Sequence, residues 1–338
     1  MLERLVAYFN EQIPGIAKIQ IEDTVQHDGI EFPLYSVILG TEDKTAPCVG
    51  IFGGVHGLER IGSEVVIAYL QSISEVLLWD DLFRERLKTS RLVFMPIVNP
   101  VGMFHTKRAN GNGVDLMRNS PTVAEVPPPF LLGGQTYSKK LPWYRGTTEN
   151  IDSMEVESRA LCKLVERELF PSRAFVTIDV HSGFGTVDRL WFPYAKSKLP
   201  PPNLEEITAM KRLFDRSYPN HPYQIEPQAK SYTTHGDLWD YLFDQHRAMK
   251  TGATYVPWTL ELGSWIWLKK NPKQFFSPLG AFNPIQPHRL KRILRRHLTL
   301  FDFLHRAVMS SEPWTKLDTE ARESLRRRAM DLWYDEKK

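Results

Sequence analysis

Residues capable of metal binding and acid–base chemistry follow four apolar, β-branched runs of the chain. The runs are residues 47–55, 91–98, 174–180 and 255–260. The residues that come after them, in chain order, are His56, Glu59, Arg108, Asp115, His181 and Glu261. Open α/β sheets bind ligands outside the carboxyl ends of their strands. We therefore expect these side chains to converge, although they are scattered over more than half of the sequence.

The types and spacing of three of these residues suggest a zinc site. Zinc binds imidazole nitrogen and carboxylate oxygen, and a catalytic site keeps three protein ligands and one open position. His56 and Glu59 are three residues apart, so one turn can aim both at a point that His181 reaches from a neighbouring strand. Taken alone, a His-x-x-Glu pair is more often no metal site at all. It is usually a histidine near the start of a helix with an acidic residue in the first turn, where the helix dipole favours negative charge. The second strand-end histidine and the strand-end glutamate favour the metal site.

Four sequence blocks carry these residues: Gly53–Glu59, Gly113–Asn119, Asp179–Ser182 and Thr259–Glu261. In order and spacing they resemble the M14 family of zinc carboxypeptidases. Weaker similarities lie at residues 144–146, 153–157 and 232–240. The resemblance covers roughly residues 45–265. It implies a zinc-dependent hydrolase of an amide bond.

The resemblance also implies one Zn²⁺ ion and roles for the residues around it. The residues that correspond to the zinc ligands are His56, Glu59 and His181. Glu261 matches the general base that takes a proton from water, and Arg108 matches the arginine that stabilises the oxyanion. Asp115 matches the carboxylate that orients the first ligand imidazole.

Substrate recognition follows the family pattern only in part. Arg118 matches the arginine that binds the terminal carboxylate of the substrate, and Tyr232 matches the mobile tyrosine of the family. Met117 stands where the family usually has asparagine. Because a thioether donates no hydrogen bond, we expect carboxylate binding to be weaker or arranged differently.

Several other residues have open assignments. Trp239 either lines the side-chain pocket or packs in the core, and Arg60 is a candidate substitute for an arginine that some family members carry between the two zinc ligands. The remaining histidines lack a partner pattern and are interpreted as ordinary surface or core residues, although His105 and His235 lie near the site segments. Cys162 is interpreted as a small buried hydrophobic residue.

Strand-like runs alternating with helical patterns predict a three-layer α/β/α fold with a central mixed, largely parallel sheet flanked by helices. The expected helices cover residues 62–73, 152–169, 204–218, 290–308 and 314–333. We expect one zinc-hydrolase domain over residues 1–310, with a long surface loop at 119–150, and a C-terminal helical extension at 311–338. The loop contains many prolines and glycines and has no usable periodicity.

Composition excludes several protein classes. The 338 residues are 42% hydrophobic and 25% charged, which is a globular composition and not a disordered one. Two cysteines rule out a disulfide scaffold or a cysteine-rich zinc module. The start lacks the pattern of a secretory signal and no apolar stretch is long enough to span a membrane, so we expect a cytoplasmic protein without membrane partners.

The positive charge is concentrated near the end of the chain. Residues 289–338 hold 13 Lys and Arg against 8 Asp and Glu. A solvated helix face explains this better than nucleic-acid binding, because the main body is near neutral.

Three functions remain open. The first is a zinc-dependent metallopeptidase of carboxypeptidase type that acts on small peptides. The second is an N-acyl amino acid deacylase or an amidase for peptidoglycan-derived peptides on the same fold, which Met117 motivates. The third is a non-catalytic peptide-binding protein. The expected partner is a small peptide or acyl-amino-acid substrate, and the oligomeric state is left open.

Overall fold

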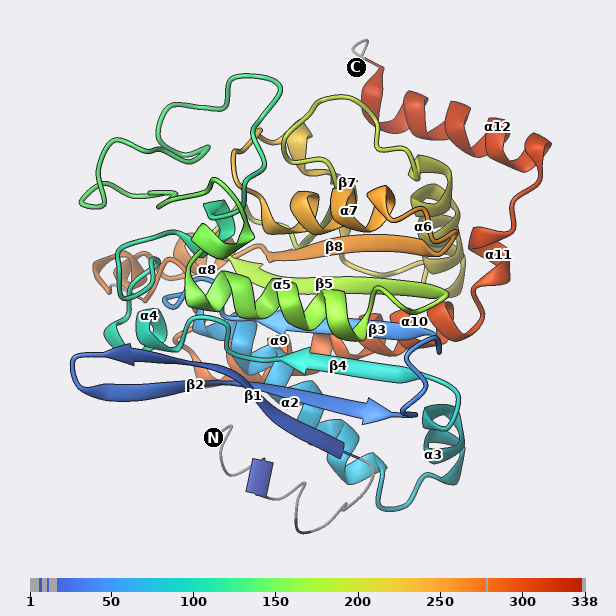
Figure 1. The fold of residues 1–338 in the computed structure, drawn as a ribbon, viewed down its shortest axis with the longest axis horizontal. Helices are drawn as coiled ribbons and strands as arrows, with labels where there is room; N and C mark the ends of the chain where they lie inside the picture. The colour runs from blue at the N-terminus through green and yellow to red at the C-terminus, as the bar shows by residue number, and fades with distance from the viewer. Residues whose placement is uncertain (1–5, 8–10, 12–16, 278, 336–338) are drawn as a thin grey trace.

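An eight-stranded mixed sheet organises the computed structural model, which describes residues 6–7, 11, 17–277 and 279–335. The strand order is β1-β2-β4-β3-β5-β8-β6-β7 (Figure 1). The strands are β1 (Ala17–His27), β2 (Ile30–Gly40), β3 (Cys48–Gly53), β4 (Arg91–Met95), β5 (Ala174–Ser182), β6 (Arg189–Phe192), β7 (Gln224–Pro227) and β8 (Thr254–Leu262). The four predicted apolar runs are β3, β4, β5 and β8, which pair in parallel at the centre of the sheet.

Antiparallel pairing is confined to the flanks of this parallel centre. The β1–β2 hairpin joins β4 on one side, and β6 joins β8 on the other. The central strands are buried along nearly their whole length, which is why they appear in the sequence as continuous apolar runs instead of alternating ones.

Helices cover both faces of the sheet. The α-helices are α2 (Arg60–Val76), α3 (Asp81–Leu87), α4 (Pro100–His105), α5 (Val156–Glu168), α6 (Leu204–Ser217), α7 (Leu238–Ala248), α8 (Trp265–Lys270), α9 (Pro287–Arg296), α10 (Leu298–Met309), α11 (Glu312–Thr315) and α12 (Thr319–Ala329). Short 3-10 turns are η1 (Leu116–Arg118), η2 (Ile151–Ser153), η3 (Gln228–Lys230) and η4 (Pro272–Phe276), and η5 (Met330–Tyr334) is a π-helical turn.

Two hydrophobic cores, one on each side of the sheet, make the three layers. Helices α2, α6, α9 and α10 pack on one face together with Val176, Ile178 and Val180 of β5. Helices α5 and α7 pack on the other face, the one that Phe175 of β5 shares (Figure 1). The predicted three-layer α/β fold with a mixed sheet is therefore confirmed.

Helix boundaries differ from the sequence prediction at several places. The helix predicted at 152–169 begins at Val156, because residues 151–153 form a 3-10 turn capped by the side chain of Asn150. The single helix predicted at 290–308 is broken into α9 and α10 at His297. The buried imidazole of His297 hydrogen-bonds the hydroxyl of Tyr223 at 2.8 Å, which ties the break to the core.

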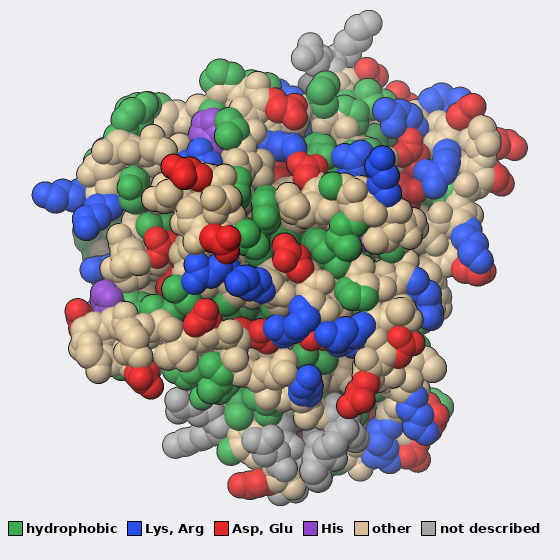
Figure 2. Space-filling model, viewed as in Figure 1, with side chains coloured by type: hydrophobic (Ala, Val, Ile, Leu, Met, Phe, Trp, Pro, Cys, Tyr) green, Lys and Arg blue, Asp and Glu red, His purple; other side chains and the backbone are tan. Residues whose placement is uncertain are grey.

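The segment predicted as one helix at 314–333 consists of three shorter pieces, of which α11 and α12 pack on α6 and η5 packs on Phe192 of β6. Arg322 and Arg326 pair with Glu206 and Glu205, and Trp333 is buried and donates to the carbonyl of Ile225. Acidic and basic side chains are interspersed over the face of the molecule seen in Figure 2. Two arginines of the basic C-terminal segment thus pair with acidic side chains of α6.

The buried side chain of Arg145 ties the far part of the loop at 119–150 to the start of the loop and to Arg118 just before it. Its guanidinium donates to the carbonyl oxygens of Arg118, Ser120 and Thr122. The loop closes on itself through a bridge between Gln135 and Tyr144. This anchoring brings part of the loop to the carboxyl end of the sheet.

Among the described residues, no single helix is both long and apolar enough to cross a membrane; only α2 and α3 taken together, with a 114° bend between them, meet that criterion by length and composition.

Candidate active site

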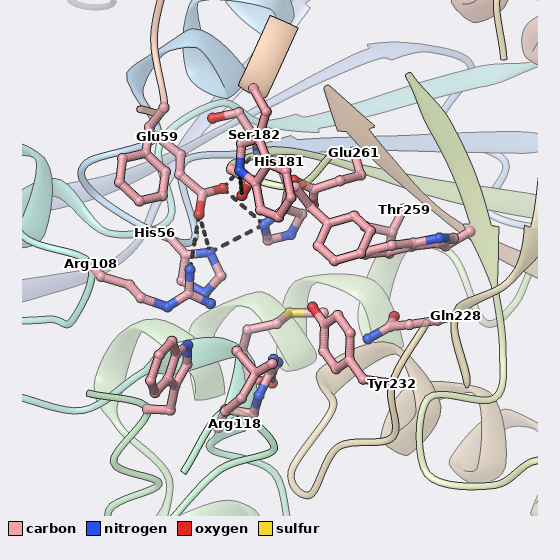
Figure 3. Close-up of a pocket in the computed structure, with 18 residues that line it drawn as sticks. His56, Glu59, Arg108, Arg118, His181, Ser182, Gln228, Tyr232, Thr259 and Glu261 are labelled. Atoms are coloured by element: carbon pink, nitrogen blue, oxygen red, sulfur yellow. Dashed lines mark hydrogen bonds and ion pairs between the residues drawn. The ribbon is translucent and has the colours of Figure 1, made fainter. Parts of the chain in front are cut away.

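Three buried side chains meet at the carboxyl end of the central strands. His56 and Glu59 lie in the turn after β3, and His181 lies near the end of β5 (Figure 3). His56 Nδ1 is 3.0 Å from Glu59 Oε1, and His181 Nδ1 is 3.2 Å from His56 Nδ1 and 3.3 Å from Glu59 Oε2. All three residues are at most 4% exposed. The sequence-predicted ligands are therefore brought together.

The outer nitrogen of each imidazole contacts a carboxylate. His56 Nε2 is 3.0 Å from Asp115 Oδ1, and His181 Nε2 is 2.7 Å from Asp179 Oδ2. If each Nε2–H donates to its carboxylate, both Nδ1 atoms are unprotonated and face each other and Glu59. Three acceptors gathered this closely need a proton or a cation between them, and two imidazoles with one carboxylate are a zinc ligand set. The site fits the ion that the sequence predicted.

Side chains two residues apart on a strand point to the same face of the sheet, which explains why β5 supplies both His181 and its carboxylate partner Asp179. Asp179 and His181 point to the same face of the sheet, opposite to Val180 in the core of α2. In the parallel register with β8, His181 lies opposite Glu261. The same alternation therefore delivers a ligand, its carboxylate partner and the candidate base to one place.

Close backbone packing shapes the turn that carries His56 and Glu59. A Cβ on Gly57 would lie 2.0 Å from the carbonyl carbon of Gly102 in α4, so only glycine fits there. The backbone N–H of Glu59 bonds to the carbonyl of His56 at 3.0 Å, and the N–H of Ser182 donates to Glu59 Oε2 at 2.9 Å. These contacts fix the direction of the Glu59 carboxylate.

The side chains of the cluster shift one another's pKa values. Burial opposes ionisation of Glu59, but the neighbouring His56 and His181 lower its pKa well below the usual range. Burial also opposes the charge on His181, and Asp179 together with Glu59 nevertheless raises its pKa. Both shifts show how strongly this cluster attracts positive charge.

Glu261 lies beside this cluster and behaves differently. Burial first, and then the charge of Glu59, raise the pKa of Glu261 to about 8, against the opposing effects of His181 and Arg108. A carboxyl group with a pKa near neutrality can both accept and donate a proton. Glu261 is therefore chemically suited to the predicted role of base.

Arg108 joins the cluster through two carboxylates. Its Nε donates to Asp115 Oδ2 at 2.8 Å and its Nη1 to Glu59 Oε1 at 3.1 Å. Burial disfavours its charge, but Asp115 and Glu59 outweigh burial and raise the pKa of the guanidinium. Asp115 thus contacts both His56 and Arg108 and sets their relative position.

The cluster opens into a cavity of about 340 Å³. Its lining includes His56, Glu59, Arg108, Met117, Arg118, His181, Tyr232 and Glu261, so these predicted site residues share one cavity, with Asp115 behind them. Figure 3 shows Arg118 and Tyr232 on the side opposite Glu59 and Ser182. Burial raises the pKa of the Tyr232 hydroxyl, and the nearby charge of Arg118 opposes that rise.

Other lining residues were not singled out from the sequence. They come from the 119–150 loop (Leu132 and Trp143) and from segments elsewhere in the chain (Phe184, Trp191, Gln228, Trp265 and Phe282). Asp179 was also missed as the partner of His181. Its position two residues before a predicted ligand on the same strand was a signal that could have found it.

The structure decides the open assignments. Trp239 does not line the cavity: its ring packs on Phe52 and its Nε1 donates to Asp179 Oδ2 at 3.0 Å. Trp191 lines the cavity instead. Arg60 donates to the Met103 carbonyl and to Thr106 Oγ1, so it supports the end of α4 and does not reach the cavity.

Two further assignments concern residues near the site. The ring of His235 accepts a hydrogen bond from the Ala124 N–H in the long loop and does not line the cavity. Cys162 is fully buried in the core that contains α5 and α7, as predicted.

Comparison with known proteins identifies the family. The zinc carboxypeptidase family model (Peptidase_M14) matches residues 2–264. The chain belongs to this family. The family that the sequence resemblance implied is therefore confirmed.

The chain is also similar to a known relative and to two solved structures. Carboxypeptidase E of Caenorhabditis elegans is 26% identical over 139 residues, which are 37% of this chain and 29% of that protein, so the match spans less than a third of the relative. Thrombin-activatable fibrinolysis inhibitor superposes with a TM-score of 0.68 at 18% identity over 91% of this chain and 73% of that one. Carboxypeptidase A from Helicoverpa armigera gives 0.63 at 18% identity over 92% and 72%. These two structures share the fold.

Proposed function

We propose that this protein is a zinc-dependent peptidase of carboxypeptidase type that hydrolyses the last peptide bond of small peptides. The observation that carries the proposal is the buried trio of His56, Glu59 and His181, with their acceptor atoms turned toward one another beside Glu261. When bound there, Zn²⁺ supplies a Lewis acid that acidifies water and polarises a carbonyl.

Glu261 and Arg108 have complementary tasks in this proposal. Glu261 takes the proton from the attacking water at its carboxylate and returns it to the leaving amine. Arg108, held by Asp115, directs its remaining N–H groups at the oxygen where negative charge develops. Because Asp115 fixes Arg108 beforehand, little reorganisation accompanies the reaction.

Arg118 and Tyr232 provide the means to bind the substrate's terminal carboxylate. Arg118 is largely buried but lines the cavity, and its Nη1 donates to the Met117 carbonyl at 3.4 Å, so the guanidinium has further N–H groups to offer an anionic ligand there. Met117 beside it adds only a thioether to the cavity. Carboxylate recognition therefore depends on Arg118 and Tyr232, because Met117 cannot donate.

The test uses short peptides that carry either a free or an amidated C-terminus, followed by mass spectrometry. We expect release of one C-terminal residue from the free acids, little turnover of the amides, loss of turnover with chelator and recovery with Zn²⁺. Internal cleavage would contradict carboxypeptidase action. Stoichiometric zinc without turnover of any amide bond would favour a non-catalytic binding protein.

Met117 motivates the second candidate, an N-acyl amino acid deacylase or peptidoglycan-peptide amidase. An apolar side chain at this place gives no second hydrogen bond to a substrate carboxylate. It suits a substrate whose acyl group fills the cavity instead. Met117→Asn separates the two candidates. It should lower KM for free-acid peptides if the protein is a carboxypeptidase, and it should leave peptide turnover unimproved if acyl-amino acids are the substrates.

A further inference from the structure

A second group of two imidazoles and one carboxylate lies outside the active site. His27 and Asp28 end strand β1 and begin the β1–β2 turn, and His105 is the last residue of α4. Asp28 Oδ2 is 3.4 Å from His27 Nε2 and 4.0 Å from His105 Nε2. We propose that His27, Asp28 and His105 bind a second zinc ion, which would join the hairpin to α4.

The distances suit such an ion. With Zn–N and Zn–O bonds of about 2.0–2.2 Å, neighbouring ligand atoms of a tetrahedral site lie roughly 3.3–3.6 Å apart. The His27–Asp28 distance already meets this value, and the His105–Asp28 distance meets it after a small side-chain rotation. The two side-chain imidazoles are 25% and 32% exposed, so water can occupy the fourth position. Imidazole ligands favour zinc over Mg²⁺ or Ca²⁺.

The two imidazoles are packed against their surroundings before any ion binds. Asp28 has a positive φ of 49° in the β1–β2 turn, and its carboxylate lies beside His27. The rings of His27 and His105 meet edge to face at 5.2 Å. Phe32 of β2 packs on Phe104 of α4 at 5.6 Å, which docks the hairpin on the helix.

The backbone of Gly111 supports the far side of the His27 ring. A Cβ at position 111 would lie 2.6 Å from His27 Nδ1, so the ring packs directly against this glycine. With Nδ1 against the backbone, Nε2 is the nitrogen that faces Asp28. The packed rings therefore lose little conformational entropy when an ion binds, whereas the exposed Asp28 side chain has to be ordered by the ion.

Binding at this place would reinforce an element of the active site without belonging to it. His105 precedes Arg108 by three residues, and Arg60 already ties the end of α4 to the start of α2, directly after Glu59. None of the three proposed ligands lines the catalytic cavity. The inference therefore stands whether or not the proposed peptidase activity is correct.

The experiment titrates Zn²⁺ into the full chain after one equivalent has been loaded, with calorimetry and metal analysis as readouts. The unmodified protein should bind a second ion. His27→Asn and His105→Asn should each weaken that binding by roughly 100-fold or more, since even loss of a residue that only orients a ligand costs about 10–100-fold. Mg²⁺ should not bind there.

His288→Asn is the matched control, because His288 is an exposed histidine of α9 far from these residues in sequence. It should bind the second ion as the unmodified protein does. Circular dichroism checks that each variant is folded. Saturation of the unmodified protein at one ion, or a second ion that persists in both His27→Asn and His105→Asn, would overturn the proposal.

Discussion

The molecule holds two clusters with the same ligand types in different surroundings. The inner cluster is His56, Glu59 and His181, and the outer cluster is His27, Asp28 and His105. The inner side chains are at most 5% exposed, whereas the Asp28 side chain of the outer cluster is 74% exposed.

The difference shows that ligand type alone does not make a catalytic site. In the inner cluster, Asp115 and Asp179 hold the far nitrogens of both imidazoles, which orients the rings and makes them better ligands. Only the inner cluster shares a cavity with Glu261 and Arg108. We therefore expect tight binding and chemistry at the inner cluster, and weaker binding without chemistry at the outer one.

The largest expected effect comes from removing the base beside the inner cluster. Glu261→Gln keeps the size of the side chain but cannot accept the proton, so peptide turnover should fall by about 1,000-fold while the zinc content is unchanged. The control is Glu157→Gln, at another buried carboxyl whose pKa burial raises to about 7, but outside the cavity. Full turnover in Glu261→Gln would remove Glu261 from the mechanism.

The next effect tests whether the carboxylate partners distinguish the two clusters. Asp179→Asn should weaken zinc binding at the inner cluster by about 10–100-fold, because His181 loses its charged partner. The dissociation constant is measured by competition with a chromophoric chelator. Trp239→Phe, which removes a donor to Asp179 and some ring volume but leaves the Asp179 carboxylate in place, should cause a smaller loss. Equal zinc affinities of the unmodified protein and Asp179→Asn would show that the carboxylate partners do not distinguish the two clusters.

Burial of imidazole also predicts the pH dependence of stability. Burial lowers the pKa of His305 to about 4 in the folded chain, from an unfolded value of 6.5, and nearby Arg86 lowers it further. The stability that comes from keeping this ring neutral is present above pH 6.5 and is lost as the pH falls toward 4. Between pH 7 and pH 5 the loss should be about 2 kcal/mol.

Urea unfolding at the two pH values measures this loss. His305→Gln keeps a polar group near Ser90, which bonds His305 Nε2 at 2.8 Å, but it cannot titrate. The variant should therefore lose less stability between pH 7 and pH 5 than the unmodified protein. An identical pH dependence would show that His305 does not contribute.

The smallest effect concerns the packing behind the outer cluster. Gly111→Ala places a methyl group against the His27 ring, so the ring must shift and second-site zinc affinity should fall by about tenfold. Turnover and inner-cluster zinc should stay unchanged, because Gly111 lies outside the cavity. Calorimetry of the protein already loaded with one zinc ion measures the affinity of the second site. Unchanged second-site affinity would mean that the Gly111 contact does not orient His27.

Much of the inner site was predictable because its signals are local. The apolar runs that became β3, β4, β5 and β8 were visible in the sequence, and so were the residue types at their ends. The departure at Met117 could also be identified there. A strand that is buried on both faces of a parallel sheet is a continuous run of apolar residues, so a short window of sequence is enough to detect such a strand.

Contacts between distant segments were decided by the tertiary structure alone. The choice of Trp191 over Trp239 as a cavity residue, the approach of the long loop and the meeting of His27 with His105 each depend on how separate elements pack. The break between α9 and α10 at His297 depends on Tyr223, which lies far away in the chain. The hydrophobic periodicity of one helix or strand predicts which of its faces is buried, but it does not predict which other element packs against that face.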